Sequence, residues 1–231
     1  MKSIVYDALC EAIHQHKKIL TVLIDPEKFD LSNLSSFLNK IPQETALLFV
    51  GGSATNDLKI EETVKELKDK TDFPVILFPG DFSQLTENAD AVLFLSLLSG
   101  RNPEYLINQQ IKGAGRLKEM NLEVIPTAYL LIDGGNHSSV ARITNTKPLG
   151  QHEIDEILHT ALAGVYMGAK MIYLEAGSGA TIPVSEEIIN KVKKYVKIPL
   201  IVGGGIKTKE QRDRAFQAGA DIVVMGTVFE N

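Results

Sequence analysis

The chain has 231 residues, of which 44% are hydrophobic and 23% charged, and its formal net charge is −5. These values are ordinary for a globular protein, and the acidic balance without any Lys/Arg block argues against nucleic acid as a partner. A single cysteine excludes an internal disulfide and no apolar run is long enough to span a bilayer, so we expect a cytoplasmic protein without a transmembrane segment.

Eight apolar segments, expected as strands, alternate with helical patterns along the chain. The first, residues 19–24 (I-L-T-V-L-I), is a continuous apolar run typical of a strand covered on both faces. The others lie at 46–50, 75–78, 91–95 and 123–132, and within 171–179, 200–206 and 222–227. Eight such units predict a parallel sheet closed into an α/β (β/α)8 TIM barrel, built as one domain from residues 1–231.

Capping signals mark the helices between these strands. Asn102, followed by Pro103 and Glu104, predicts a helix that runs to about Met120. Thr208 and Gln211 have the spacing of a capping box. Further helices are expected at 4–13, at 31–38 after Asp30, after Asn56, at 154–165 and after Ser185.

Two connections depart from the regular alternation. Residues 80–90 are too few for a helix and a loop, so we expect the third helix of the barrel to be reduced or missing. Residues 133–150 are long, polar and contain glycine, which is typical of a mobile active-site loop rather than a domain linker.

Three strands in the last third of the chain end in glycines. They read M-I-Y-L-E-A-G-S-G at 171–179, L-I-V-G-G-G-I at 200–206 and I-V-V-M-G-T at 222–227. Glycine lets backbone amides approach an anion closely, and phosphate-binding barrels place such a site late in the chain. Any one of these glycines could merely turn a strand into a loop, but together they predict a phosphate site.

Two carboxylates lie at strand ends, where a barrel gathers its functional residues. Tyr173 and Glu175 alternate along one strand, so both can point inward, and Glu175 is a candidate acid or base; the alternative is an ion-paired core carboxylate. Asp25 and Ser53 follow adjacent strands and could form part of a Mg²⁺ site. Alternatively, Asp25 caps the turn at Pro26 and the Ser53 hydroxyl belongs to a glycine-rich turn.

Five motifs carry a resemblance that runs along essentially the whole chain. They are L-I-D-P-E-K at 23–28, V-G-G-S at 50–53, Y-L-E-A-G-S-G at 173–179, V-G-G-G-I at 202–206 and V-M-G-T at 224–227. The set resembles the geranylgeranylglyceryl phosphate synthase family. The resemblance implies a prenyltransferase that moves a geranylgeranyl group from geranylgeranyl diphosphate to sn-glycerol 1-phosphate, forming an ether lipid precursor.

The resemblance also implies roles for individual residues. Glu175 and Tyr173 would be catalytic, and Asp25 and Ser53 would hold Mg²⁺. The residues expected to bind sn-glycerol 1-phosphate are Tyr173, Leu174, Glu175, Ala176, Gly177, Ser178, Gly179, Gly204, Gly205, Gly226 and Thr227. We also expect a homo-oligomer, either a dimer or a hexamer.

The prenyl tail needs an apolar groove, for which the helix after Asn102 offers Tyr105, Leu106 and Ile107. S-L-L-S-G-R-N-P at 96–103 resembles the branch of the family with a twenty-carbon donor, and Tyr105 is the candidate stop for the tail. The alternative for Tyr105 is an ordinary packing contact.

Three other functions stay open at this level. A phosphosugar isomerase or lyase would need a second acid/base, for which Asp133 is the candidate. A non-catalytic phosphate sensor would need neither Asp25 nor Glu175. The third is a synthase that uses a longer, heptaprenyl donor.

Overall fold

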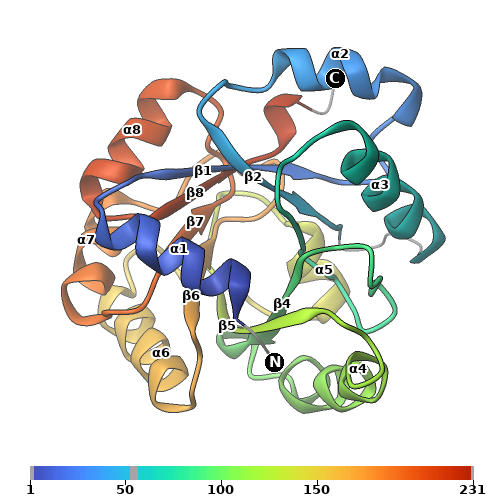
Figure 1. Ribbon diagram of the computed structural model, residues 1–231. Helices are drawn as coiled ribbons and strands as arrows, with labels where there is room; N and C mark the ends of the chain where they lie inside the picture. The colour runs from blue at the N-terminus through green and yellow to red at the C-terminus, as the bar shows by residue number, and fades with distance from the viewer. Residues whose placement is uncertain (1–2, 53–56, 230–231) are drawn as a thin grey trace.

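The computed structural model describes residues 3–52 and 57–229, and its strands form a closed parallel barrel in sequence order (Figure 1). The barrel closes because β1 pairs with β2 on one side and with β8 on the other. The strands are β1 (Ile19–Ile24), β2 (Thr45–Val50), β3 (Val75–Leu77), β4 (Ala91–Leu97), β5 (Glu123–Leu131), β6 (Met171–Glu175), β7 (Leu200–Gly203) and β8 (Ile222–Met225). The predicted TIM barrel is confirmed.

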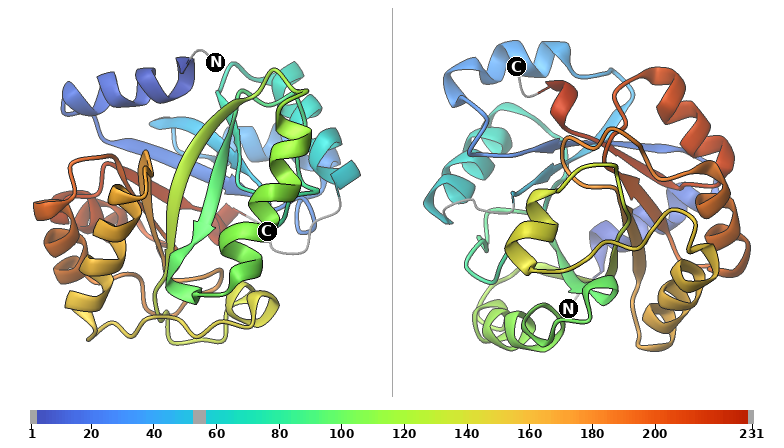
Figure 2. Two further views of the ribbon diagram at one scale, coloured as in Figure 1. Left: turned by 90° about the horizontal axis from the view of Figure 1, so that it is seen from below. Right: turned by 180° about the vertical axis from the view of Figure 1, so that it is seen from behind.

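Helices surround the barrel and cover both of its ends. They are α1 (Ile4–His14), α2 (Leu34–Lys40), α3 (Asp57–Lys70), α4 (Gln109–Leu117), α5 (Ser139–Thr144), α6 (Ile154–Tyr166), α7 (Glu186–Tyr195) and α8 (Lys209–Ala218). Helix α1 lies across the amino-terminal end of the barrel, and α5 lies at the opposite end (Figures 1 and 2). Within the described ranges, no helix combines the length and apolarity that crossing a bilayer requires.

Side chains alternate along the strands between the inside of the barrel and the layer under the helices. On β2, Leu47 and Phe49 belong to the interior cluster, whereas Leu48 and Val50 pack beneath α2 and α3. On β6, Tyr173 is interior and Leu174 packs outward in the cluster that includes residues of α6 and α7. Glu175 therefore shares the inward face of Tyr173, one step nearer the rim.

The segment between β3 and β4 has no helix; residues 78–90 form turns and irregular backbone. The predicted loss of the third helix is confirmed. The segment is still anchored, because Asp90 accepts a hydrogen bond from the Val75 amide at 2.7 Å and pairs with Lys68 on α3. The side of the barrel between α3 and α4 is therefore covered by this segment and by α4.

Two connections differ from the sequence-based expectation. Residues 133–150 are not a plain loop, because they contain α5 and their end pairs with the end of β5 through a bridge between Ile132 and Leu149. Ser138 caps α5 by accepting from the Ala141 amide, a local signal that the sequence analysis missed. The helix expected from Asn102 is divided into a π-helical turn, η3 (Glu104–Asn108), and α4.

Candidate active site

A cavity of about 240 Å³ lies at the carboxyl ends of the strands, beside α5. Its walls come from seven strand ends and one helix. The lining residues include Asp25, Lys28, Gly51, Gly52, Phe78, Tyr129, Arg142, Tyr173, Glu175, Ser178, Gly204, Gly205, Lys207 and Gly226. Parallel strands of a barrel share one rim, which explains why residues from position 25 to position 226 meet here.

Glu175 is the buried acid of this cavity, with only 6% of its surface exposed. Burial raises the pKa of its carboxyl group to about 7, although the neighbouring Tyr173 hydroxyl and the Gly177 amide act in the opposite direction. The Gly177 amide donates to Oε1 at 2.7 Å. In the described part of the chain no basic side chain pairs with Glu175, so the alternative of an ion-paired core carboxylate does not hold there. A carboxyl group with this pKa can take up or release a proton near neutral pH.

Two tyrosine hydroxyls are buried beside this carboxylate. Tyr129 and Tyr173 are neighbours across β5 and β6, with ring centroids 5.3 Å apart, and Phe78 stacks on Tyr173 at 5.2 Å. Neither hydroxyl has a hydrogen-bond partner of good geometry in the described structure. Burial raises the pKa of both tyrosines well above the usual value, so both keep their protons. They are therefore available as donors to a bound molecule, and Tyr129 is one that the sequence analysis missed.

Glycines next to Glu175 leave room that no other residue could leave. A Cβ on Gly203 would lie 2.6 Å from the Tyr173 hydroxyl and 2.7 Å from Glu175 Oε2. A Cβ on Gly204 would collide with Glu175 Oε1, and Gly204 also has a positive φ of 81°. The sequence V-G-G-G-I is thus required by close approach and by backbone conformation.

The same glycines offer free amides to the cavity. Within residues 3–52 and 57–229, the N–H groups of Gly204, Gly205 and Gly226 donate no hydrogen bond, and all three residues line the cavity. Free amides at strand ends can bind an anion. Gly177 differs, because its amide already serves the Glu175 carboxylate and a Cβ there would meet Ser138 at 2.5 Å.

Three cations stand at the mouth of the cavity: Lys28, Arg142 and Lys207. Lys28 Nζ donates to the Ser178 hydroxyl at 3.3 Å and lies 3.5 Å from Asp25 Oδ2. The Arg142 guanidinium, on α5, makes no ion pair or hydrogen bond with the described residues. Positive charges beside free amides favour a phosphorylated ligand. Arg142 was not predicted from the sequence, where Asp133 is the one residue of 133–150 that was given a candidate role.

Of the two residues predicted to hold Mg²⁺, Asp25 lies within the described structure, whereas Ser53 lies outside the described residues. Asp25 Oδ1 accepts from the Glu27 amide at 3.1 Å, so the turn-forming role at Pro26 is also present. The side chain is 17% exposed and lines the cavity. No group of three His, Cys, Asp or Glu side chains suited to a metal occurs in the described part of the chain. One carboxylate beside a phosphate site fits Mg²⁺, which keeps waters and takes substrate phosphates as ligands.

The remaining predicted site residues are spread over different environments. Leu174 and Ala176 pack outward, in the cluster between the barrel and the helices. Gly179 is exposed and does not line the cavity. Thr227 begins a 3-10 helix, η4 (Thr227–Phe229), but its side chain lies outside the described part of the structure. Any contact that these residues make with a substrate stays a prediction.

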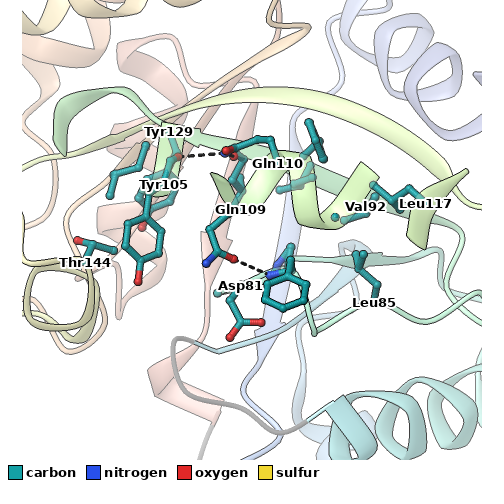
Figure 3. A pocket seen from close by; sticks show the side chains of 17 residues that line it. Asp81, Leu85, Val92, Tyr105, Gln109, Gln110, Leu117, Tyr129 and Thr144 are labelled. Carbon is teal, nitrogen blue, oxygen red and sulfur yellow. Dashed lines mark hydrogen bonds between the residues drawn. The ribbon is translucent and has the colours of Figure 1, made fainter. Parts of the chain in front are cut away.

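An apolar groove adjoins the cavity where the third helix is missing (Figure 3). Tyr129 lines both spaces, so they lie side by side. The groove runs between β4, the segment after β3 and the helix α4, and its lining includes Phe82, Leu85, Val92, Phe94, Tyr105, Gln109, Gln110, Gly113 and Leu117. Of the three residues expected to form such a groove, Tyr105 lines it, whereas Leu106 and Ile107 do not, and Ile107 is 55% exposed.

Comparison with known proteins places the chain in a family. The model of the PcrB family matches residues 12–231. The geranylgeranylglyceryl phosphate synthase of Zunongwangia profunda is 56% identical over 98% of this chain and 97% of its own length. The enzyme of the same name from Pyrococcus furiosus is 41% identical over 94% of this chain and 86% of its own.

A solved structure agrees with these sequence matches. The (S)-3-O-geranylgeranylglyceryl phosphate synthase of Thermoplasma acidophilum, in complex with its substrate sn-glycerol-1-phosphate, has a TM-score of 0.90 and 34% identity. The match covers 100% of this chain and 93% of that one. The resemblance found in the motifs is therefore confirmed: this chain belongs to the PcrB family, as a relative of the geranylgeranylglyceryl phosphate synthases over nearly its whole length.

Proposed function

We propose that this protein transfers a geranylgeranyl group from geranylgeranyl diphosphate to a hydroxyl of sn-glycerol 1-phosphate. The observation that carries the proposal is that a phosphate-type cavity and an apolar groove lie side by side, with Tyr129 in the wall of both. A small phosphorylated acceptor and a long apolar donor need these two environments side by side. Relatives up to 56% identical bear the name of this activity.

The acceptor phosphate would be bound by the free amides of Gly204, Gly205 and Gly226. Arg142 and Lys207, which also line the cavity, supply positive charge. With its phosphate held there, the glycerol part reaches toward Glu175 and the two tyrosine hydroxyls. Positioning of this kind lowers the barrier because it converts an encounter into an oriented pair.

In the reaction, the acceptor hydroxyl oxygen forms a bond to C1 of the donor while the bond from C1 to the diphosphate oxygen breaks. The electron pair of the broken bond leaves with diphosphate, and the hydroxyl proton goes to Glu175. A carboxylate whose pKa is about 7 suits this role near neutral pH. Because the allylic carbon develops positive charge, a weak nucleophile is sufficient, and the stacked rings of Phe78 and Tyr173, which line the cavity, would stabilise that charge.

Mg²⁺ would be held by Asp25, together with substrate phosphate oxygens, and would neutralise the charge of the leaving diphosphate. Lys28, near both Asp25 and Ser178, adds a fixed positive charge on the same side. The assignment of Ser53 to the metal follows from the motif alone.

The donor tail would lie in the groove between β4 and α4. Apolar burial provides the binding energy, about 0.8 kcal/mol for each methylene group removed from water. With the tail entering next to Tyr129, the diphosphate end would lie in the cavity. A twenty-carbon tail is the length that we propose.

The isomerase or lyase alternative needs a second acid/base at the cavity, and its candidate, Asp133, does not lie there. Asp133 is exposed, its Oδ1 accepts from the Gly135 amide at 2.9 Å, and it does not line the cavity. An apolar groove next to the cavity would also have no use in the handling of a phosphosugar.

The test is incubation of the protein with sn-glycerol 1-phosphate and geranylgeranyl diphosphate, with Mg²⁺ or with a chelator. We expect the ether product and diphosphate, detected by mass spectrometry and a diphosphate assay, with Mg²⁺ only. Acceptor binding without turnover would point to the phosphate sensor. A higher kcat/KM with a thirty-five-carbon donor than with the twenty-carbon donor would point to the heptaprenyl enzyme.

A further inference from the structure

One helix position in the donor groove carries no side chain. Gly113 lies within α4, is buried and lines the groove. Glycine is the least favourable helix residue after proline, so its presence in the interior of a helix has to be explained. Tyr105, Gln109, Gly113 and Leu117 follow each other at intervals of four and present one face of the helix to the groove.

The space in front of Gly113 is small but real. A Cβ there would lie 3.8 Å from Phe94 Cε2 and 3.9 Å from Phe82 Cβ, which is ordinary van der Waals contact. A methyl group therefore fits without strain. A larger side chain would extend between Phe82 and Phe94, both of which also line the groove.

The opposite wall is tied to α4 on both sides of this position. One turn before it, Gln109 Oε1 accepts from the Phe82 amide at 2.9 Å. Three residues after it, the Arg116 guanidinium donates to the carbonyls of Ser83 at 2.6 Å and of Leu85 at 3.3 Å. The segment that replaces the third helix therefore cannot move away from a bulky side chain at Gly113 without breaking these bonds.

The groove also has a direction. Tyr105 packs against the interior cluster that contains Tyr129, at the end of the groove next to the cavity. Leu85, Val92 and Leu117 belong to the outer cluster under α3 and α4, and Figure 3 shows Leu85 and Leu117 at the other end. Gly113 lies between these ends along α4, so a tail entering at Tyr129 must pass it.

We propose that Gly113 sets the cross-section of the donor groove and thereby the longest prenyl chain that the protein accepts. The inference rests on the proposed function and names its specificity-determining position. Carbons beyond a blocked Gly113 would be displaced into water. Each methylene group that loses its burial weakens binding about fourfold, so one isoprene unit is worth about 100-fold or more.

The experiment compares Gly113→Leu, Gly113→Ala and a matched control, Gly115→Leu. Gly115 lies two residues further along α4, is exposed and has nothing within 4 Å of its Cβ position. Both leucine variants gain the same helix propensity, so they differ only in the direction of the side chain. The readouts are kcat/KM for donors of ten, fifteen and twenty carbons, the Kd of geranylgeranyl diphosphate by calorimetry, and thermal unfolding.

We expect Gly113→Leu to lower kcat/KM for the twenty-carbon donor by about 100-fold or more, while the value for the ten-carbon donor stays within about threefold. Gly113→Ala should unfold at a higher temperature and retain the twenty-carbon donor. Gly115→Leu should show the wild-type order of donors. An unchanged order in a folded Gly113→Leu protein, or an equal loss in both leucine variants, would overturn the inference. If the wild type itself forms no ether product, the proposed function fails first, which is a distinguishable result.

Discussion

The cavity and the groove meet at Tyr129, but they are built on different principles. The cavity takes its chemistry from backbone and charge: free glycine amides, one buried carboxyl group and three cations at its mouth. The groove is apolar and exists because an element is missing, the helix between β3 and β4. In the cavity, substitutions should change the chemistry; in the groove, they should change which donor is accepted.

The two regions also differ in whether they have room for an added methyl group. Around Glu175 a single methyl group on Gly203 would already be too close to two oxygens. In the groove, a methyl group on Gly113 meets only ordinary contacts. The two regions can therefore be tested separately, and each of the following predictions could show that they are not separate.

The largest effect is expected for Asp25→Asn. Loss of the carboxylate that would hold Mg²⁺ removes several kcal/mol of charge stabilisation, so turnover should fall by about 10⁴-fold. Binding of sn-glycerol 1-phosphate, measured by calorimetry, should stay close to wild type because the free amides lie directly after β7 and β8. Collapse of acceptor affinity as well would place Asp25 on the acceptor side and contradict the assignment.

Glu175→Gln should lower kcat by about two to four orders of magnitude, because the amide keeps the shape but cannot take the proton. In the wild type, kcat should rise with pH through about 7, the pKa of this group. Near-normal activity of the variant would mean that water or phosphate accepts the proton, and the cavity would then act by positioning alone.

The same variant has a second readout in stability. The pKa of Glu175 is raised from 4.5 to about 7 by burial, so the unfolded chain releases this proton first as pH rises. The free energy of unfolding should therefore fall between about pH 4.5 and pH 7, by a total of about 3 kcal/mol. Urea unfolding of Glu175→Gln should lack this part of the pH dependence; an identical slope in both proteins would contradict burial of an uncharged carboxyl group.

Arg142→Ala tests whether α5 belongs to the cavity. Ser138, at the start of α5, lies against Gly177 in the loop after β6, which puts the helix on the side of the cavity where we propose that the acceptor binds. We expect KM for sn-glycerol 1-phosphate to rise about tenfold with a small change in kcat, as for one hydrogen bond to a charged group. Arg214→Ala is the control, since Arg214 is an exposed arginine on α8 outside the cavity. Equal effects of the two variants would mean that Arg142 acts only as a general surface charge.

The smallest effect is expected for Tyr105→Ala. The sequence favoured Tyr105 as the stop for the tail, but the structure places it at the end of the groove that joins the cavity, where its hydroxyl lies 3.4 Å from the Ile143 carbonyl. The ratio of kcat/KM between donors of twenty and thirty-five carbons should change by less than about fourfold, the contribution of one methylene group. A larger shift toward the longer donor would restore Tyr105 as the stop and argue against Gly113.

Much of the fold could be predicted because its signals are local. The run at 19–24 matches β1, the missing helix follows from a count of residues, and the Thr208–Gln211 capping box is present. Glu175 and Tyr173 were placed on one face by alternation alone, and the structure agrees. These inferences need only the period of a strand or the length of a connection.

The parts that were missed depend on distant contacts. Nothing near Arg142 in the sequence indicates that α5 lies at the cavity, because the Gly177 loop and the pairing of Leu149 with the end of β5 determine that position. Tyr129 has no motif around it, and its role follows from pairing with Tyr173 across two strands. The assignment of Leu106 and Ile107 to the groove failed because the π-helical turn η3 sets which face of the helix looks inward.

The absence of room at Gly203 and Gly204 has a consequence for how this protein can diverge. A side chain at Gly203 would collide with Glu175 and with the Tyr173 hydroxyl, and a side chain at Gly204 would collide with Glu175. A variant library centred on these two positions should therefore be almost entirely inactive. Lineages that keep the fold would then preserve the chemistry at the acceptor, while the length of the prenyl chain that they attach could change freely. In such a scaffold, new lipid products would arise by changes along α4, one methyl group at a time, without any intermediate that loses the reaction.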